Sequence, residues 1–440
     1  MRKKLLKIFG LVSIFAIALT GCATVSSISN PTPDEVLYSG GSVVQVGDYL
    51  YYANAYTAVG TSSTDFAYKD NAKLSYLNRA NLAKGFTNKI ESPVETAKVN
   101  SKVVGFEQSY MFVLGDYIYY TSPSTHKNKQ LNHTYNLVSL FRSKLNGDSV
   151  KEIMTTDQFN ASTAQMRVLK GSDKNYYWIV YDGTEITSIK IGNTIGKKQV
   201  IAKDVTSLAL PNGNEEFDVA KIFYTTTVDK TPRVCYVDYA TGKSDSATCE
   251  EAFELRGRQG DTIFYKDDDY ETKYKTVTKS SGLDFSGSRK LFDMSDVDEI
   301  HAAYQGYVFV ASNALVYKNT VTNAESVTLL QSDEFSQILH VDDEWIYYST
   351  GSEIKMLSVR GVQKEEDVEK LLVVTMKSSI TGSVSVVDDY LYFYAGLEPL
   401  SDDDEAQYKE TKNLYLYRVK MWSNQDYQIL SNFTRTEIED

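Results

Sequence analysis

One pattern of apolar, turn and aromatic positions recurs along most of the chain. A short apolar run, such as Met111–Leu114, is followed by Gly-Asp or Asp-Asp and then by an aromatic run, as in Gly115–Tyr120. The pair favours a tight turn, because Asp bonds nearby backbone groups and Gly accepts a positive φ. The runs on either side favour strands. A third strand is predicted at Leu140–Arg142, and the turn Asn146–Gly147 leads to an outer strand at Val150–Met154.

The pattern occurs eight times, in copies that end 38 to 68 residues apart. A period in the forties with four short strands is typical of a propeller blade. We therefore predict an all-β fold, a single β-propeller of about eight four-stranded blades, or seven if one weak copy belongs to a neighbouring blade. No long helical periodicity follows the first residues. The copies end at Tyr52, Tyr120, Tyr177, Tyr224, Tyr265, Val310, Tyr348 and Phe393.

These units resemble the YWTD-type propellers of low-density-lipoprotein receptors and, more closely, a bacterial family of tyrosine-rich extracellular propellers of unassigned function. The residues that carry the resemblance are Gly115–Ser122 and Ser139–Asp148, and it extends over residues 40–430. It implies a propeller fold. The Asp of the YWTD motif is missing after most of the Tyr pairs, so the resemblance does not extend to receptor-type ligand binding.

A charged start and a short apolar run precede the repeats. Four basic residues among the first seven are followed by an apolar stretch from Ile8 to Leu19, as in a secretory signal. The next residues, Leu19–Cys22, resemble the lipobox of bacterial lipoproteins, which implies lipid attachment to the Cys22 thiol and cleavage before it. We expect a signal peptide at 1–21, a lipidated tether at 22–35, the propeller at 36–434 and a tail at 435–440. The lipid would hold the protein on the extracytoplasmic side of a cell membrane.

Charge and motif content exclude some classes of partner and activity. The net charge is −12, and loss of residues 1–21, with four basic residues and no acidic ones, makes it −16. Such a chain repels nucleic-acid phosphates, so no nucleic-acid partner is expected. Local catalytic motifs and phosphate loops are absent, and we expect no enzymatic activity, cofactor or metal. We expect an anchored protein that presents propeller loops to a protein or glycan partner. The alternatives are a propeller hydrolase acting on extracellular polysaccharide and an assembly scaffold for envelope proteins.

Three connections between second and third strands are long, namely Ala53–Lys73, Thr121–Asn136 and Ala395–Lys412. In a closed ring the first and last units are neighbours, so these loops would share one face where units eight, one and two meet. Long loops on a rigid scaffold commonly bind partners, although mobile insertions without a partner fit equally well. The candidate contact residues are Tyr56, Phe66, Tyr68, His126, His133, Tyr135, Asp402, Asp403, Asp404 and Tyr408.

Cys235 and Cys249 are predicted to form a disulfide across a hairpin. Each is seven residues from Gly242, so a turn centred there would place them opposite each other. Opposed Cβ atoms lie about 4.5–5.5 Å apart, and export provides a permissive compartment. Reduced, packed thiols are the alternative.

The remaining histidines, acidic runs and third-strand arginines are expected to have structural roles. His301 and His340 fall in the inner strands of neighbouring units, but a metal site would need further ligands. Acidic runs such as Asp267–Asp269 and Asp296–Glu299 lack the spacing of a calcium loop and are expected to be solvated. The third-strand arginines are expected to pack over Tyr rings, and these are Arg79, Arg142 and Arg418.

Overall fold

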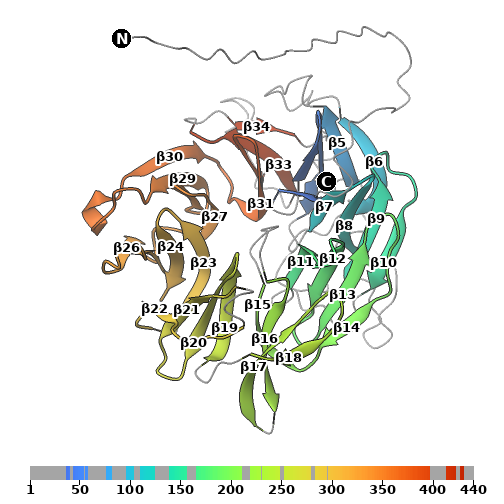
Figure 1. Cartoon of the computed structure of the whole chain (residues 1–440). Coiled ribbons are helices and arrows are strands. Elements are labelled where there is room, and N and C mark those ends of the chain that lie inside the picture. Colours follow the sequence, from blue (N-terminus) through green and yellow to red (C-terminus); the bar gives the residue numbers. More distant parts are fainter. Residues whose placement is uncertain are drawn as a thin grey trace, which may run out of the picture.

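The chain forms a ring of eight β-sheets (Figure 1). The structure is a computed structural model that describes residues 36–39, 43–53, 55–57, 76–81, 96–103, 110–123, 138–155, 165–210, 219–228, 230–247, 252–278, 283–294, 296–396, 413–422 and 427–430. Within these residues one short 3-10 helix, η2 (Glu365–Asp367), accompanies the strands. The all-β prediction and the count of eight blades are confirmed.

Each blade contains four antiparallel strands that are ordered in space as in sequence. Their first strands lie toward the centre of the ring (Figure 1). The strands of blades 1 and 2 are β2 (Val43–Val46), β3 (Tyr49–Ala53), β5 (Tyr76–Asn81), β6 (Thr96–Val103), β7 (Met111–Leu114), β8 (Tyr117–Pro123), β9 (Val138–Lys144) and β10 (Lys151–Thr155). Those of blades 3 and 4 are β11 (Gln165–Lys170), β12 (Tyr176–Tyr181), β13 (Ile186–Ile191), β14 (Gln199–Ala202), β15 (Val205–Ala209), β16 (Ile222–Val228), β17 (Thr231–Val237) and β18 (Ser244–Ser246).

The second half of the ring repeats this arrangement. The strands of blades 5 and 6 are β19 (Ala252–Gln259), β20 (Thr262–Asp267), β21 (Thr272–Thr276), β22 (Arg289–Phe292), β23 (Val297–Ala303), β24 (Gly306–Ala311), β25 (Ala314–Asn319) and β26 (Val327–Leu330). Those of blades 7 and 8 are β27 (Gln337–Val341), β28 (Trp345–Ser349), β29 (Glu353–Ser358), β30 (Lys370–Thr375), β31 (Thr381–Val387), β32 (Tyr390–Ala395), β33 (Asn413–Lys420) and β34 (Tyr427–Ile429).

The antiparallel order gives the ring two different faces. The turns from the first to the second strand and from the third to the fourth lie at one end of each sheet, which we name the turn face. The connections from the second to the third strand, and from each blade to the next, lie at the other end, which we name the loop face. On the turn face the two turns of a blade are joined, because Leu145 N donates to the Asp116 carbonyl at 3.2 Å and Met421 N to that of Asp389 at 2.7 Å.

The hydrophobic core is divided among the interfaces between neighbouring blades. Between blades 2 and 3, for example, Phe112 and Tyr119 pack edge-on against Trp178, with ring centroids 5.1 and 6.0 Å apart. Large buried rings contribute much apolar area, and such edge contacts add to it. Each blade therefore buries both of its faces, which requires the ring to close.

Two short strands near the N-terminal end close the ring. β1 (Val36–Tyr38) adds to β7 as an innermost fifth strand, and the Ser39 carbonyl accepts a hydrogen bond from Val386 N of β31 at 3.0 Å. β4 (Ala55–Thr57) pairs with the start of β33. Blades 1, 2 and 8 are thus tied together by segments that precede or follow the first blade's inner hairpin.

Candidate functional site

The three long connections leave the loop face from blades 8, 1 and 2, which are neighbours in the ring. The pairing of β4 with β33 joins the first of these connections to blade 8, and it places Tyr56 opposite Leu414. Part of the segment expected to be loop is therefore a strand. Tyr56 is the one predicted contact residue that the structure describes. The other nine lie outside the described residues, and these are Phe66, Tyr68, His126, His133, Tyr135, Asp402, Asp403, Asp404 and Tyr408.

The predicted register of the cysteine hairpin is wrong. Cys235 lies opposite Ser246, not Cys249, and burial raises the pKa of its thiol. The cause is the turn, in which the Asp238 carboxylate accepts hydrogen bonds from two backbone amides. This turn runs from Asp238 to Lys243, so Gly242 is near its end and not at its centre. Cys249 and Cys22 lie outside the described residues, and the disulfide and the lipid stay predictions.

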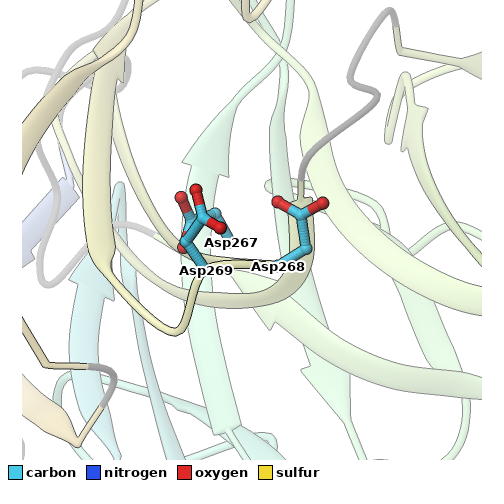
Figure 2. A group of neighbouring side chains, drawn as sticks. All are labelled: Asp267, Asp268 and Asp269. Atoms are coloured by element: carbon cyan, nitrogen blue, oxygen red, sulfur yellow. The ribbon is translucent and has the colours of Figure 1, made fainter.

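The acidic run Asp267–Asp269 forms the turn between the second and third strands of blade 5, on the loop face. The three carboxylates lie with oxygen atoms within 4.8 Å of one another (Figure 2). Asp267 is buried, pairs with Lys273 at 2.5 Å and accepts a hydrogen bond from Glu271 N at 2.7 Å. Its carboxylate is therefore engaged in closing the hairpin, and only Asp268 and Asp269 face solvent. The geometry explains the turn without a cation.

A second polar group lies on the inner strands of blades 5 and 6. Arg256 of β19 contacts Glu254 at 3.4 Å and Asp298 of β23 at 3.5 Å. The pairing of β23 with β24 shifts between Asp298 and His301, and Glu299 within this bulge has a φ of 46°. Solvent reaches the Glu299 carboxylate, yet the surrounding protein raises its pKa, first by desolvation and then through the charge of Asp298.

His301 and His340 lie on the neighbouring inner strands β23 and β27, as predicted. Burial, and next the charge of His340, lower the pKa of His301 to about 4. Burial also lowers the pKa of His340, against the opposing effect of Asp342. Both imidazoles are therefore neutral at pH 7. Among the described residues neither belongs to a group of three metal-ligating side chains.

The third-strand arginines pack over aromatic rings, as the sequence predicts. Arg79, Arg142 and Arg418 lie 5.0, 4.2 and 4.1 Å from the ring centroids of the first Tyr of the second strand. These arginines belong to blades 1, 2 and 8; in blade 7, Trp345 takes the Tyr position and Met356 takes that of the Arg.

Within the described part of the chain, no helix has the length and apolar character needed to cross a bilayer.

No family model matches the sequence, and no curated protein sequence matches it either. Among solved structures, the chain is similar to puromycin hydrolase, at 9% identity and a TM-score of 0.44 over 72% of this chain and 52% of that one. It is similar to the tricorn protease, at 9% identity and a TM-score of 0.39 over 89% of this chain and 44% of that one. It is also similar to a chain of the nidogen/laminin complex, at 10% identity and a TM-score of 0.29 over 66% of this chain and 92% of that one. The chain thus spans about half the length of the two peptidases.

These comparisons concern the fold alone, but they correct one expectation. The prediction that the chain is not an enzyme, drawn from missing local motifs, is contradicted by the peptidases among the similar structures. Catalytic groups in a propeller come from distant blades and leave no local spacing in the sequence, so missing motifs are no evidence against catalysis.

Proposed function

We propose that the chain is a lipid-anchored propeller that binds a protein or glycan partner through its loop face. The observation that supports this orientation is the register of β1, in which Val36 lies opposite Leu114 and Tyr38 opposite Phe112. Leu114 directly precedes the turn at Gly115, so the chain enters the ring at the turn face. A lipid upstream of Val36 would hold that face toward the membrane and direct the long connections outward.

The predicted tether limits how far the propeller reaches. Residues 23–35 form a segment with an expected span of about 20 Å if they behave as a flexible coil. The loop face would then meet partners within the cell envelope. Replacing Cys22 with Ala should abolish metabolic labelling with palmitate; undiminished labelling would remove the anchor from the proposal.

Binding is tested with the soluble domain from Ala23 onward, lacking Cys22. We expect capture of an envelope protein or a saturable signal on a glycan array. A variant in which residues 58–73, 124–136 and 397–412 become short turns should lose that binding and keep its melting temperature, since β4 and its pairing with β33 are retained. The matched control replaces the exposed turn-face residues Lys197 and Lys198 with Ala and should bind normally. Full binding by the shortened variant would place the surface elsewhere.

A second candidate is hydrolysis of an extracellular polysaccharide, and Glu299 favours it. A carboxyl group with a raised pKa beside a second carboxylate, here Asp298, suits a general acid. Its positive φ adds a strained backbone of the kind that clusters at functional sites. Release of reducing ends from envelope polysaccharide by the soluble domain, abolished in Glu299→Gln, would support this activity. Equal release by the variant would exclude Glu299 from it.

A further inference from the structure

We propose that the turn face carries a binding site for an organic ammonium group between blades 7 and 8. The site consists of a pair of Trp rings and three carboxylates, and these residues are Trp345, Trp422, Asp343, Asp388 and Asp389. It lies on the face opposite the long connections and does not require the lipid anchor, so it goes beyond the proposed function.

The Trp pair involves the first ring of the second strand in blade 7. In the blades with a third-strand arginine, the first ring of the second strand is covered by that guanidinium. Trp345 has no such cover, because Met356 stands at the Arg position. Its ring instead meets Trp422 of blade 8, with centroids 4.4 Å apart and planes at 84°. An aromatic face that an internal cation occupies in blades 1, 2 and 8 is here built from two blades.

Trp422 presents its ring to solvent. It is 52% exposed, whereas Trp178, elsewhere in the ring, is fully buried. Its backbone has a φ of 70°, a region that bulky residues rarely adopt. A single exposed ring is common on protein surfaces, but here Trp345 packs against it and the two rings form a joint aromatic surface.

A buried tyrosine packs against Trp422. Tyr347 is 0% exposed, and its ring lies edge-on to Trp422 with centroids 6.4 Å apart. Among the described residues its hydroxyl has no hydrogen-bond partner. The same repeat position in blades 1 and 2 holds Tyr51 and Tyr119, whose hydroxyls bond to carbonyls of the next blade. The interface beneath the Trp pair therefore has unused hydrogen-bonding capacity, which buried polar groups seldom retain.

The turns near Trp345 and Trp422 are negatively charged, which favours a cationic ligand. Asp343 precedes Trp345 by two residues, and the turn of Asp388 and Asp389 is bonded to the turn of Trp422 through Met421 N at 2.7 Å. All three carboxylates are exposed, and within the described part of the chain none pairs with a cation. An aromatic face attracts cations through its quadrupole, and the carboxylates add to that attraction. An anion would be repelled, and a neutral sugar would gain only ring contact.

The ammonium group has two possible sources, a free compound or a lipid head group. The turn face is the one that the proposed anchor would direct toward a membrane, so both sources are sterically open. Their chemistry is the same: a positive nitrogen with attached carbons that lies on the Trp422 ring.

Tryptophan fluorescence of the soluble domain tests the site, because two of the three Trp residues of the chain belong to it. We titrate with choline at constant ionic strength, and with 3,3-dimethylbutan-1-ol, which has the same shape without the charge. Choline should give a saturable change in emission, and the neutral compound should bind at least about tenfold more weakly. Trp422→Ala should abolish the response, and the triple change of Asp343, Asp388 and Asp389 to Asn should weaken it at least about fivefold. Tyr270→Ala, which removes another exposed ring, is the matched control and should respond normally.

Vesicles distinguish the two sources. Flotation of the domain with phosphatidylcholine vesicles, but not with phosphatidylglycerol vesicles, would assign a lipid head group; a choline response without flotation would assign a free compound. Equal responses to choline and its neutral isostere, a response to cellobiose alone, or an unchanged choline response in folded Trp422→Ala would each overturn the proposal.

Discussion

The third residue of the aromatic run plays different roles in different blades. Tyr51 and Tyr119 donate to the carbonyls of Leu145 and Gly192 at 3.0 and 3.1 Å, and so connect each blade to the next. Tyr347 is equally buried, but its hydroxyl has no partner among the described residues. One repeat position therefore supplies a hydrogen bond in two blades and a desolvated, unused hydroxyl in a third.

Removing these hydroxyls should have unequal effects on stability. Tyr119→Phe should lower the free energy of unfolding by about 1–3 kcal/mol, because Arg142 still donates to the Gly192 carbonyl but Gly192 N loses the hydroxyl as its acceptor. Tyr347→Phe should leave it unchanged or raise it, since no bond is lost. Urea unfolding of both variants measures the difference. An equal loss in both would mean that Tyr347 has a partner in solution.

His301 predicts a decline of stability in acid. Its pKa is about 4 in the folded chain, through burial and the charge of His340, against about 6.5 when unfolded. Protonation of His301 therefore favours the unfolded chain. The neutral imidazole contributes its full stabilisation above about pH 6.5, and this contribution is lost progressively as the pH falls to about 4. His301→Asn should flatten the dependence of unfolding free energy on pH within this window. Urea unfolding at pH 7, 6 and 5 tests this, and parallel curves for variant and parent would contradict it.

At the scale of the elements, the sequence predicts strands that carry the repeat and misses those that do not. The inner and second strands of blades 1, 2 and 8 follow from a local pattern, because each pairs with its neighbour in sequence. β1 and β4 are three residues long and pair with β7 and β33, which are distant in sequence, so nothing local reveals them. The hairpin register around Cys235 was missed because Asp238 caps the turn and shifts its centre away from Gly242.

The same difference between local patterns and distant contacts decides which candidate sites the sequence reveals. The shared face of the three long connections follows from strand order, which the repeat reveals. The contact of Trp345 with Trp422 joins blades 7 and 8 across residues distant in sequence, so no local pattern reveals it.

Two glycines in blades 5 and 6 provide a matched test of strand packing. A Cβ on Gly306, at the start of β24, would overlap the Lys318 carbonyl oxygen of β25. Because this neighbour is backbone, Gly306→Ala should destabilise the fold by roughly 2 kcal/mol or more. Gly257 of β19 has open space at the same atom, and Gly257→Ala should have an effect within about 0.5 kcal/mol. Thermal unfolding compares them; a tolerated Gly306→Ala would contradict the close approach of β24 and β25.

At the scale of the whole molecule, the ring is closed by its own N-terminal region. One hydrophobic cluster includes residues of blades 8, 1 and 2, and β1 and β4 span the same junction with backbone hydrogen bonds. The predicted lipid tether is therefore connected directly to the strand that closes the ring, and it reaches that strand at the turn face. The proposed orientation on a membrane rests on this connection, because a short lipidated tether would bring its point of entry closest to the lipid.

The most direct test is the distance of each face from the membrane. The lipidated protein, with Cys235 and Cys249 changed to Ser, is reconstituted in vesicles that contain an acceptor dye on the lipid. A donor dye is placed at Asp116→Cys on the turn face or at Ser332→Cys on the loop face, positions separated along the ring axis by about the 17–20 Å length of a strand. We expect clearly stronger energy transfer from position 116. Equal transfer from both positions, or stronger transfer from position 332, would contradict it.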